Sequence, residues 1–221
     1  MPILHFPDPR RADDDGLVAI GGDLAPATLL AAYRRGIFPW PTEGMPMLWF
    51  SPGERGVLRF ADLHLPRSLR PALRRAAWEL SIDRDFAAVI DACAAAPRPG
   101  QDGTWITAEV RRAYLRLHAL GHAHSVEVWE DDELVGGIYG VDVDGAFAGE
   151  SMFHRRPNAS KAALLHLVDH LAGRGLDWLD IQVMTPHMAR LGARPVPRDE
   201  FLALLAATRA RGLRLFGLSE S

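Results

Sequence analysis

The sequence predicts an α+β protein: a small irregular N-terminal domain, then a larger domain in which a mixed sheet is flanked by helices. Three observations support this. Residues 125–153 alternate apolar and polar positions with tight turns, as antiparallel strands do. Residues 160–172 have apolar side chains at helical spacing. Residues 1–60 are rich in glycine, proline and aromatics. We therefore place the domains at 1–60 and 61–221.

The N-terminal half is expected to contain four helices. In the first, over Ala25–Arg35, Asp23 is the expected cap and Pro26 lies in the first turn. The spacing of apolar residues predicts the other three. They span Arg67–Ala77, Asp85–Ala95 and Thr107–Leu120.

The C-terminal half is expected to contain most of the sheet. The predicted strands are Ser125–Trp129, Leu134–Val141, Ala146–Phe153 and Trp178–Val183, and the predicted helices are Ser160–Ala172 and Arg198–Arg211. Glycines in the second strand suggest a bulge, and Asn158 or Ser160 would cap the first of these helices. This order of a strand meander, a crossover helix, a strand and a helix resembles the acyltransferase fold of the Gcn5-related type.

Composition excludes several classes of protein. The 221 residues are 48% hydrophobic and 24% charged, which is ordinary globular usage and excludes disorder, collagen and a disulfide scaffold. No apolar run approaches the roughly 20 residues that span a bilayer. Residues 1–15 are polar and proline-rich, where a signal peptide would need an apolar core. The single cysteine, Cys93, fits a reducing compartment. We expect a cytoplasmic protein that does not bind membranes.

The chain has 25 basic and 28 acidic residues and therefore a net charge of −3. This balance argues against a protein that binds nucleic acid through its net charge alone. Lys161 is the only lysine. This bias reflects either base composition or the suitability of guanidinium for phosphate. Four arginines share one helical stripe that is either a solvated face or a phosphate-binding surface. They are Arg67, Arg70, Arg74 and Arg75.

Three polar residues could carry chemistry. Asp180 and Gln182 share one face of an apolar strand by its period of two. Because an unpaired buried carboxylate is costly, Asp180 either bonds a neighbouring loop or, with the amide, is directed at a reacting group. Glu150 ends another apolar strand. A coenzyme A transferase would have a glycine-rich loop after that strand, and no glycine lies between Gly149 and Gly173.

Tryptophans lie in loops flanked by proline or glycine, among them Trp40 and Trp105. They either pack at a core or domain interface or form a platform that stacks a nucleobase. His166 and His170 have zinc-binding spacing, but Leu167 stands where a metalloprotease needs its glutamate. We therefore expect exposed helix histidines, no metal and no cofactor.

Several segments together form a specific pattern. They are Gly16–Leu24, Ala32–Trp40, Leu48–Pro52, Thr104–Ile106, His122–Trp129, Leu134–Gly140, Gly149–Phe153, Asn158–Lys161 and Asp180–Gln182. From about Phe6 to Leu205, the chain resembles the leucyl/phenylalanyl-tRNA–protein transferases, in which such segments occur in this order.

The resemblance implies transfer of Leu or Phe, and less readily Met, from tRNA to the α-amine of proteins that begin with Arg or Lys. The added residue marks the protein for degradation by the bacterial N-degron pathway. The family has a small N-terminal domain and a Gcn5-like C-terminal domain, and we expect a cytoplasmic monomer.

Residue by residue, the resemblance places the family's catalytic pair on Asp180 and Gln182, with Glu150 beside them. Trp40 and Trp105 match positions that contact the terminal adenosine and its aminoacyl group. The implied walls of the side-chain pocket are Phe147, Met152, Leu164 and Leu167, with Ile138 and Leu179 as neighbours. Leu167 replaces what can be an aromatic in the family, which leaves the balance between Leu and Phe open. Glu54, where the family often has Pro, and the segment 190–193 also depart from the pattern and look peripheral.

The expected reaction is aminolysis of an activated ester, to which positioning contributes much of the rate. Asp180 is expected to hold Gln182, whose amide oxygen accepts a hydrogen bond from the attacking amine. Glu150 would position the incoming N-terminus or the aminoacyl amine. Two other functions compete: a coenzyme A-dependent N-acyltransferase, and a non-catalytic RNA-binding module, which would leave these three polar residues unexplained.

Overall fold

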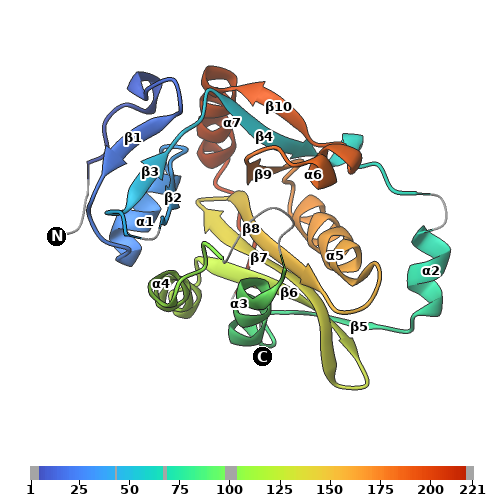
Figure 1. Cartoon of the computed structure of the whole chain (residues 1–221). Coiled ribbons are helices and arrows are strands. Elements are labelled where there is room, and N and C mark those ends of the chain that lie inside the picture. The colour runs from blue at the N-terminus through green and yellow to red at the C-terminus, as the bar shows by residue number, and fades with distance from the viewer. Residues whose placement is uncertain (1–4, 43, 67–68, 98–103, 218–221) are drawn as a thin grey trace.

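The computed structural model of the chain describes residues 5–42, 44–66, 69–97 and 104–217. Within them the chain forms a three-stranded sheet and a seven-stranded sheet (Figure 1). The small sheet has the strand order β1-β3-β2. Its region comprises η1 (Pro9–Arg11), β1 (Leu17–Ile20), α1 (Pro26–Tyr33), β2 (Phe38–Trp40) and β3 (Leu48–Phe50).

The large sheet has the strand order β10-β4-β9-β8-β7-β6-β5. Its strands are β4 (Glu54–Arg59), β5 (Glu79–Ile82), β6 (Ala123–Glu130), β7 (Glu133–Val143), β8 (Ala146–His154), β9 (Trp178–Gln182) and β10 (Arg194–Pro197). Neighbouring strands are antiparallel, except that β8 and β9 run parallel. This mixed sheet with flanking helices confirms the predicted α+β class.

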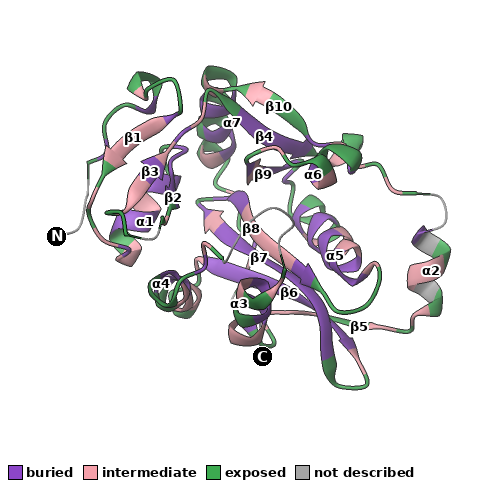
Figure 2. Ribbon diagram, in the orientation of Figure 1, coloured by how far each residue is buried: buried purple, intermediate pink, exposed green. Residues whose placement is uncertain are grey.

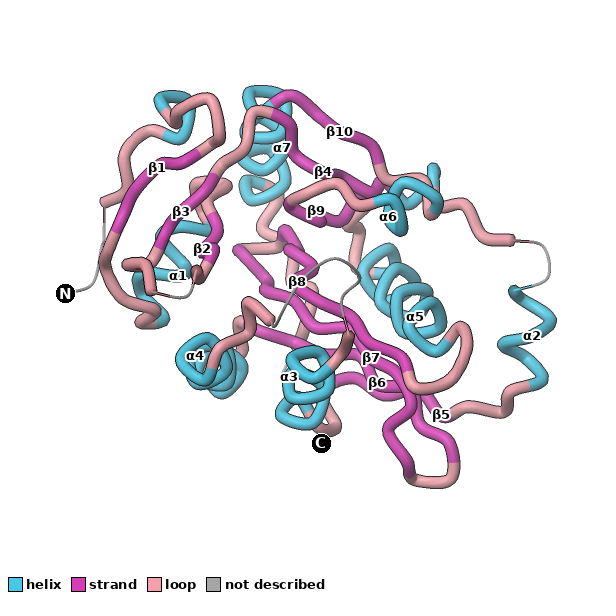
Figure 3. Tube along the Cα trace, in the orientation of Figure 1, coloured by secondary structure: helices cyan, strands magenta, loops and turns pink. Residues whose placement is uncertain are grey.

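Helices cover both faces of the large sheet (Figure 3). The helices of this part of the chain are η2 (Phe60–Asp62), α2 (Leu69–Arg75), α3 (Phe86–Ala95), α4 (Ala108–Ala119), α5 (Ala159–Gly173), α6 (Pro186–Arg190) and α7 (Arg198–Ala210). Of these, α3, α4, α5 and α7 pack against strands of the large sheet. Two glycines of β7 show the layering. A Cβ on Gly136 would lie 2.5 Å from Ala159 of α5, and one on Gly137 would lie 3.2 Å from Val89 of α3. Because successive strand residues face opposite ways, α5 and α3 lie on opposite faces.

The buried residues form two apolar clusters, visible as the buried interior of Figure 2. One cluster joins α1 and the small sheet to α3 and α4. The other packs α5 and α7 against the large sheet. The N-terminal segment is thus packed onto one face of the larger domain and is not held by a linker alone.

The strongly patterned elements match the sequence predictions within a few residues. Asp85 and Thr107, the first residues of two predicted helices, cap α3 and α4 and accept hydrogen bonds from the backbone N–H groups of Ala88 and Val110. The bulge predicted in β7 is found at Val135, which is skipped where the β6–β7 register shifts between Val128 and Trp129.

One predicted cap is wrong, and a second is confirmed in its position but lacks the capping hydrogen bond. Asp23 does not cap α1: its carboxylate accepts from the Ala25 N–H and the Thr28 hydroxyl, and Ala25 is the cap residue. Asn158 occupies the cap position of α5 in a left-handed conformation but makes no side-chain capping bond. Instead it accepts a hydrogen bond from the Lys161 ammonium.

The strand β4 connects the two parts of the chain. It precedes residue 60 in sequence, yet it pairs with β9 and β10 in the large sheet. No helix among the described residues combines the length and apolar character needed to cross a bilayer.

Candidate active site

The parallel strands β8 and β9 are joined through one register pair, Ala148 with Asp180. Past this pair, residues 149–152 of β8 and Ile181 and Val183 of the β9 segment line a cavity of about 720 Å³. A second cavity of about 140 Å³ adjoins it and shares Glu150, Ile181 and Val183 in its lining. The gap between two parallel strands therefore forms a concave site of the size that small-molecule groups occupy.

Glu150 lies where the two cavities meet. The hydroxyl of Tyr33 donates to its Oε1 at 2.6 Å, and that of Tyr114 donates to its Oε2 at 3.2 Å. The Gln182 amide Nε2 also donates to Oε1, at 2.7 Å. Burial raises the pKa of Glu150 to about 7; the charge of Asp180 adds to this rise, and the three hydrogen bonds oppose it. The carboxyl group is thus able to change protonation near neutral pH.

Gln182 departs from regular strand geometry. Its φ is +60°, a left-handed conformation that few non-glycine residues adopt. Asp180 Oδ1 accepts a hydrogen bond from the Gln182 backbone N–H at 2.9 Å. Asp180 therefore holds the backbone of Gln182, while the Gln182 side chain reaches Glu150.

Asp180 itself is buried behind this site. It lines neither cavity, and its carboxylate is paired with the guanidinium of Arg55, which donates from Nε at 2.8 Å and from Nη2 at 2.7 Å. The partner of this buried carboxylate is thus a strand arginine and the adjacent backbone, which the sequence analysis did not foresee.

The smaller cavity is aromatic. Phe38, Pro39, Trp40 and Trp105 line it together with Gln182. Trp40 is 39% exposed, and Trp105 packs edge-on against Tyr114 with their ring centroids 6.4 Å apart. The two tryptophans predicted as a stacking platform are therefore brought to one cavity from segments far apart in the chain.

The larger cavity is mainly apolar. Ile138, Met152 and Leu179 line it, three of the six predicted pocket residues. Phe147, Leu164 and Leu167 lie fully buried in the core and are not among its lining residues. Phe147 packs near Phe216, while the two leucines belong to α5. Their role as pocket walls stays a prediction.

The arginine stripe lies mostly outside what the structure describes. Arg67 is outside the described residues, and so are the side chains of Arg70 and Arg74 in α2. Arg75 is exposed at the end of that helix. Its proposed contact with phosphate stays a prediction.

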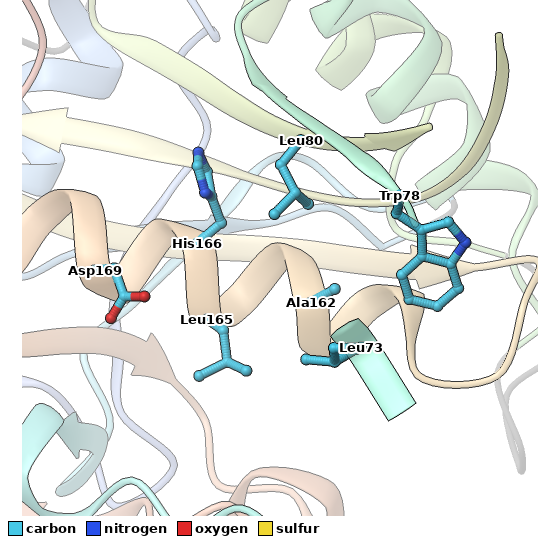
Figure 4. Close-up of a pocket in the computed structure, with 7 residues that line it drawn as sticks. All are labelled: Leu73, Trp78, Leu80, Ala162, Leu165, His166 and Asp169. Atoms are coloured by element: carbon cyan, nitrogen blue, oxygen red, sulfur yellow. The ribbon is translucent and has the colours of Figure 1, made fainter. Parts of the chain in front are cut away.

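A separate cavity of about 460 Å³ lies between α2, the β5 region and α5 (Figure 4). His166 and Asp169 line it together with Trp78 and Leu80. None of the candidate catalytic residues reaches it. In the described part of the chain, no group of three or more histidines, cysteines or acids is placed to hold a metal ion.

The histidines are less exposed than predicted. His166 and His170 are both half-buried, and His170 Nε2 lies 2.9 Å from the carbonyl oxygen of Leu215. His124 is buried. Its Nδ1 lies 2.6 Å from Oδ2 of Asp83, and its ring stacks on that of Phe216. His124 and His170 thus hold the C-terminal segment through Leu215 and Phe216, and none of the three histidines lines either cavity of the site. Cys93 is buried in the core, as expected of a structural thiol.

Sequence reasoning missed Arg55, Tyr33 and Tyr114, which hold the site together. Tyr114 shares the buried face of α4 with Val110 and Leu117, and a buried tyrosine hydroxyl usually finds a partner, which is a signal that the sequence contains. Arg55 is followed in β4 by Gly56, Val57 and Leu58, and a charged residue in a buried strand also signals a partner.

Comparison with known proteins gives a consistent result. The family model described as leucyl/phenylalanyl-tRNA protein transferase matches residues 57–206, and the model of its N-terminal domain matches residues 22–53. Among solved structures, similarity is found to a GCN5-related N-acetyltransferase from Kribbella flavida, at 14% identity and a TM-score of 0.37, covering 77% of this chain and 60% of that one.

Curated relatives named leucyl/phenylalanyl-tRNA–protein transferase match almost end to end. The protein from Anaeromyxobacter sp. (strain K) is 55% identical over 212 residues, covering 93% of this chain and 91% of the relative. The one from Nitratidesulfovibrio vulgaris (strain DP4) is 54% identical, covering 90% and 86%. The one from Myxococcus xanthus (strain DK1622) is 53% identical, covering 91% and 86%. The chain therefore belongs to the leucyl/phenylalanyl-tRNA–protein transferase family and is an aminoacyltransferase.

Proposed function

We propose that this enzyme transfers Leu or Phe, and less readily Met, from aminoacyl-tRNA to the α-amine of proteins that begin with Arg or Lys. The added residue would mark those proteins for N-degron degradation, in the cytoplasm where charged tRNA is available. The observation that carries the proposal is the junction at Glu150 of an apolar cavity of about 720 Å³ with an aromatic cavity of about 140 Å³.

The two cavities suit the two parts of an aminoacyl-adenosine. The aromatic cavity offers Trp40 and Trp105 as surfaces for the adenine ring, and base–aromatic stacking contributes about 1–3 kcal/mol per base. The apolar cavity offers Ile138, Met152 and Leu179 to the aminoacyl side chain. Leu, Phe and Met share an unbranched Cβ and an apolar body. Loss of a methylene, as in Val, weakens such a contact by about 1–3 kcal/mol.

The reaction we propose at this junction is aminolysis. The acceptor amine attacks the ester carbonyl, the C–O bond to the tRNA ribose breaks, and the proton lost by the amine ends on that ribose oxygen. An α-amine has a pKa of about 7.7–8.0, so roughly a tenth is neutral near pH 7. A strong base is therefore not required, and orientation can supply much of the rate.

Gln182 and Glu150 are the groups we assign to orient the reactants. The Gln182 Nε2 donates to Glu150, which leaves Gln182 Oε1 as an acceptor for the attacking amine. The Glu150 carboxyl group, with a pKa of about 7, would hold the aminoacyl amine or the incoming N-terminus. Asp180 supports Gln182 through its backbone N–H.

Phosphates of the tRNA are the proposed partners of the α2 arginines. The exposed position of Arg75 at the end of α2 is the structural observation that fits this assignment. Lysine and arginine side chains that neutralise phosphate make binding salt-dependent. The acceptor, being cationic, would approach the Glu150 side of the site.

The test is direct. The protein is mixed with radiolabelled Leu-tRNA and a peptide that begins with Arg, and labelled peptide is measured. A peptide of the same sequence beginning with Ala, and acetyl-coenzyme A in place of the tRNA, serve as controls. Label on the Arg peptide alone supports the proposal. Absence of label from the Arg peptide, or acetylation from coenzyme A, refutes it.

A further inference from the structure

Arg55 of β4 is buried, with 1% of its side chain exposed, and its guanidinium binds three oxygen atoms and contacts two aromatic rings. Its Nε and Nη2 form a fork on the two oxygens of Asp180, at 2.8 and 2.7 Å. Its Nη1 donates to the carbonyl oxygen of Gly36 at 3.1 Å. The rings of Phe38 and Phe201 lie on it, each with its centroid 4.6 Å from the guanidinium carbon.

These contacts join two segments that line the candidate site. On one side, Asp180 Oδ1 accepts the backbone N–H of Gln182, whose φ of +60° needs such a restraint because left-handed backbone is unfavourable for a residue with a Cβ. On the other side, Gly36 and Phe38 belong to the segment that leads into Trp40. Arg55 lines neither cavity itself.

We propose that Arg55 is a positioning residue of the transfer reaction, and that its one guanidinium fixes both the Gln182 backbone and the Trp40 segment. The inference rests on the proposed function for its substrate. It also assigns Asp180 a supporting role. Both carboxylate oxygens are bound by Arg55, and one also by the Gln182 N–H, so Asp180 holds the amide in place and takes no proton from the acceptor.

Lysine cannot reproduce this arrangement. A guanidinium is planar and offers a rigid fork of donors with two faces for aromatic rings, whereas an ammonium is a compact point charge. Arg55→Lys keeps the charge beside Asp180. It loses either the bidentate contact or the bond to Gly36, together with the stacking on both rings. A loss of activity in this variant therefore reports geometry and not charge.

The experiment measures kcat and the donor KM for Leu transfer by the full chain. We expect Arg55→Lys to lower kcat by roughly 100-fold, the scale of a 1 Å misplacement, and to raise the KM for Leu-tRNA severalfold. Arg59→Lys is the matched control, because Arg59 is the exposed arginine at the end of the same strand; its kinetics should equal those of the wild type. Hydrogen exchange should show reduced protection of the Gln182 amide in Arg55→Lys, while amides in β6 and β7 stay protected.

Wild-type kinetics and an equally protected Gln182 amide in a folded Arg55→Lys variant would overturn the inference. If Arg55→Lys does not fold, Arg55→Met/Asp180→Leu replaces the buried pair with apolar residues, a change that often preserves stability. That double variant should fold and transfer roughly 100-fold more slowly; full activity would overturn the inference. If the wild type itself transfers no Leu, the proposed function fails, and the exchange measurement still tests the role of Arg55.

Discussion

Glu150 lines both cavities of the site. The pKa of its carboxyl group is raised to about 7, chiefly by burial. Below that pH the group is protonated and cannot accept a hydrogen bond from an amine on both oxygens. We therefore expect wild-type kcat to rise with pH through about 7, in addition to the rise due to the acceptor amine. Glu150→Gln should lower kcat by roughly 100-fold, the scale of a misplaced reactant, and should lose this component of the pH profile. Rates measured from pH 5.5 to 9 with one acceptor peptide test this, and an unchanged profile in the variant contradicts it.

The same pKa shift predicts a stability effect. An unfolded glutamate ionises near 4.5, whereas folded Glu150 keeps its proton up to about pH 7. Between these values the folded state binds the extra proton, so stability falls as pH rises, by about 3 kcal/mol in all. Glu150→Gln removes the ionisation, and the variant should gain stability over the wild type at pH 8.5 relative to pH 4.5. Urea unfolding of both proteins at the two pH values measures this. If the free energies of unfolding of the two proteins differ by the same amount at both pH values, the raised pKa of Glu150 is ruled out.

Trp40 is an exposed aromatic on a cavity wall, which favours a role in binding over one in packing. Trp40→Ala should raise the KM for Leu-tRNA by about 5- to 150-fold, the equivalent of 1–3 kcal/mol for one stacked base, while Trp40→Phe keeps most of the affinity. Trp78→Phe is the control, because Trp78 lines the separate cavity beside α5. Steady-state kinetics at fixed acceptor concentration decide the matter. Equal KM values for Trp40→Ala and wild type would remove Trp40 from the donor site.

Individual residues differed in how far the sequence could predict them. Glu150 and Gln182 could be singled out because polar residues at the ends of apolar strands are unusual, and the structure brings them within hydrogen-bonding distance. The Arg55–Asp180 pair could not, since its members are 125 positions apart and only the fold brings them together. The left-handed backbone of Gln182 was also beyond prediction, because no glycine or asparagine marks it.

At the level of elements, the wall of the apolar cavity is built from three strands and from the short helix α6. Ile138 of β7 lines the cavity, whereas Leu167 of α5 lies buried in the core. Ile138→Ala should enlarge the cavity and raise the Phe-to-Leu transfer ratio. Leu167→Ala should shift the ratio in the same direction but less, and should destabilise the protein by about 2–5 kcal/mol. Competition between Phe-tRNA and Leu-tRNA, combined with urea unfolding, separates the two effects. An unchanged ratio in both variants would count against this cavity as the aminoacyl pocket.

The elements that the sequence predicted well are regularly patterned, and most of them are long. Helices α3, α4, α5 and α7 and strands β6 to β9 are examples. The missed strands, β1 to β5 and β10, span three to six residues each, and the missed helices η1, η2 and α6 are also short. Pro39 interrupts β2, and Pro195 and Pro197 lie in β10 at the sheet edge, where proline is tolerated. Such strands are specified by their partners in the sheet and not by their own pattern, so periodicity could not reveal them.

At the scale of the whole molecule, the site depends on both ends of the chain. Tyr33 of α1 and Trp40 come from the N-terminal segment, Glu150 and Gln182 come from the large sheet, and Phe201 of α7 backs Arg55. One of the two apolar clusters of buried residues packs this N-terminal segment onto α3 and α4. The domain division expected near residue 60 stays a prediction, and the contacts across it explain why the two parts would act together.

The net charge of −3 fits an enzyme whose two proposed substrates have opposite charges, an anionic tRNA and a cationic N-terminus. If the α2 arginines contact phosphate, log KM for Leu-tRNA should rise linearly with log salt concentration. Arg70→Glu/Arg74→Glu should raise that KM and reduce the slope by about 0.7–0.9 per lost phosphate contact. Arg11→Glu/Arg174→Glu makes the same change in net charge with two exposed arginines elsewhere on the surface, and it should leave the slope unchanged. Kinetics between 50 and 200 mM salt would measure both, since contacts of this kind weaken strongly over about that range. Equal slopes in wild type and Arg70→Glu/Arg74→Glu would mean that the tRNA approaches over a different face.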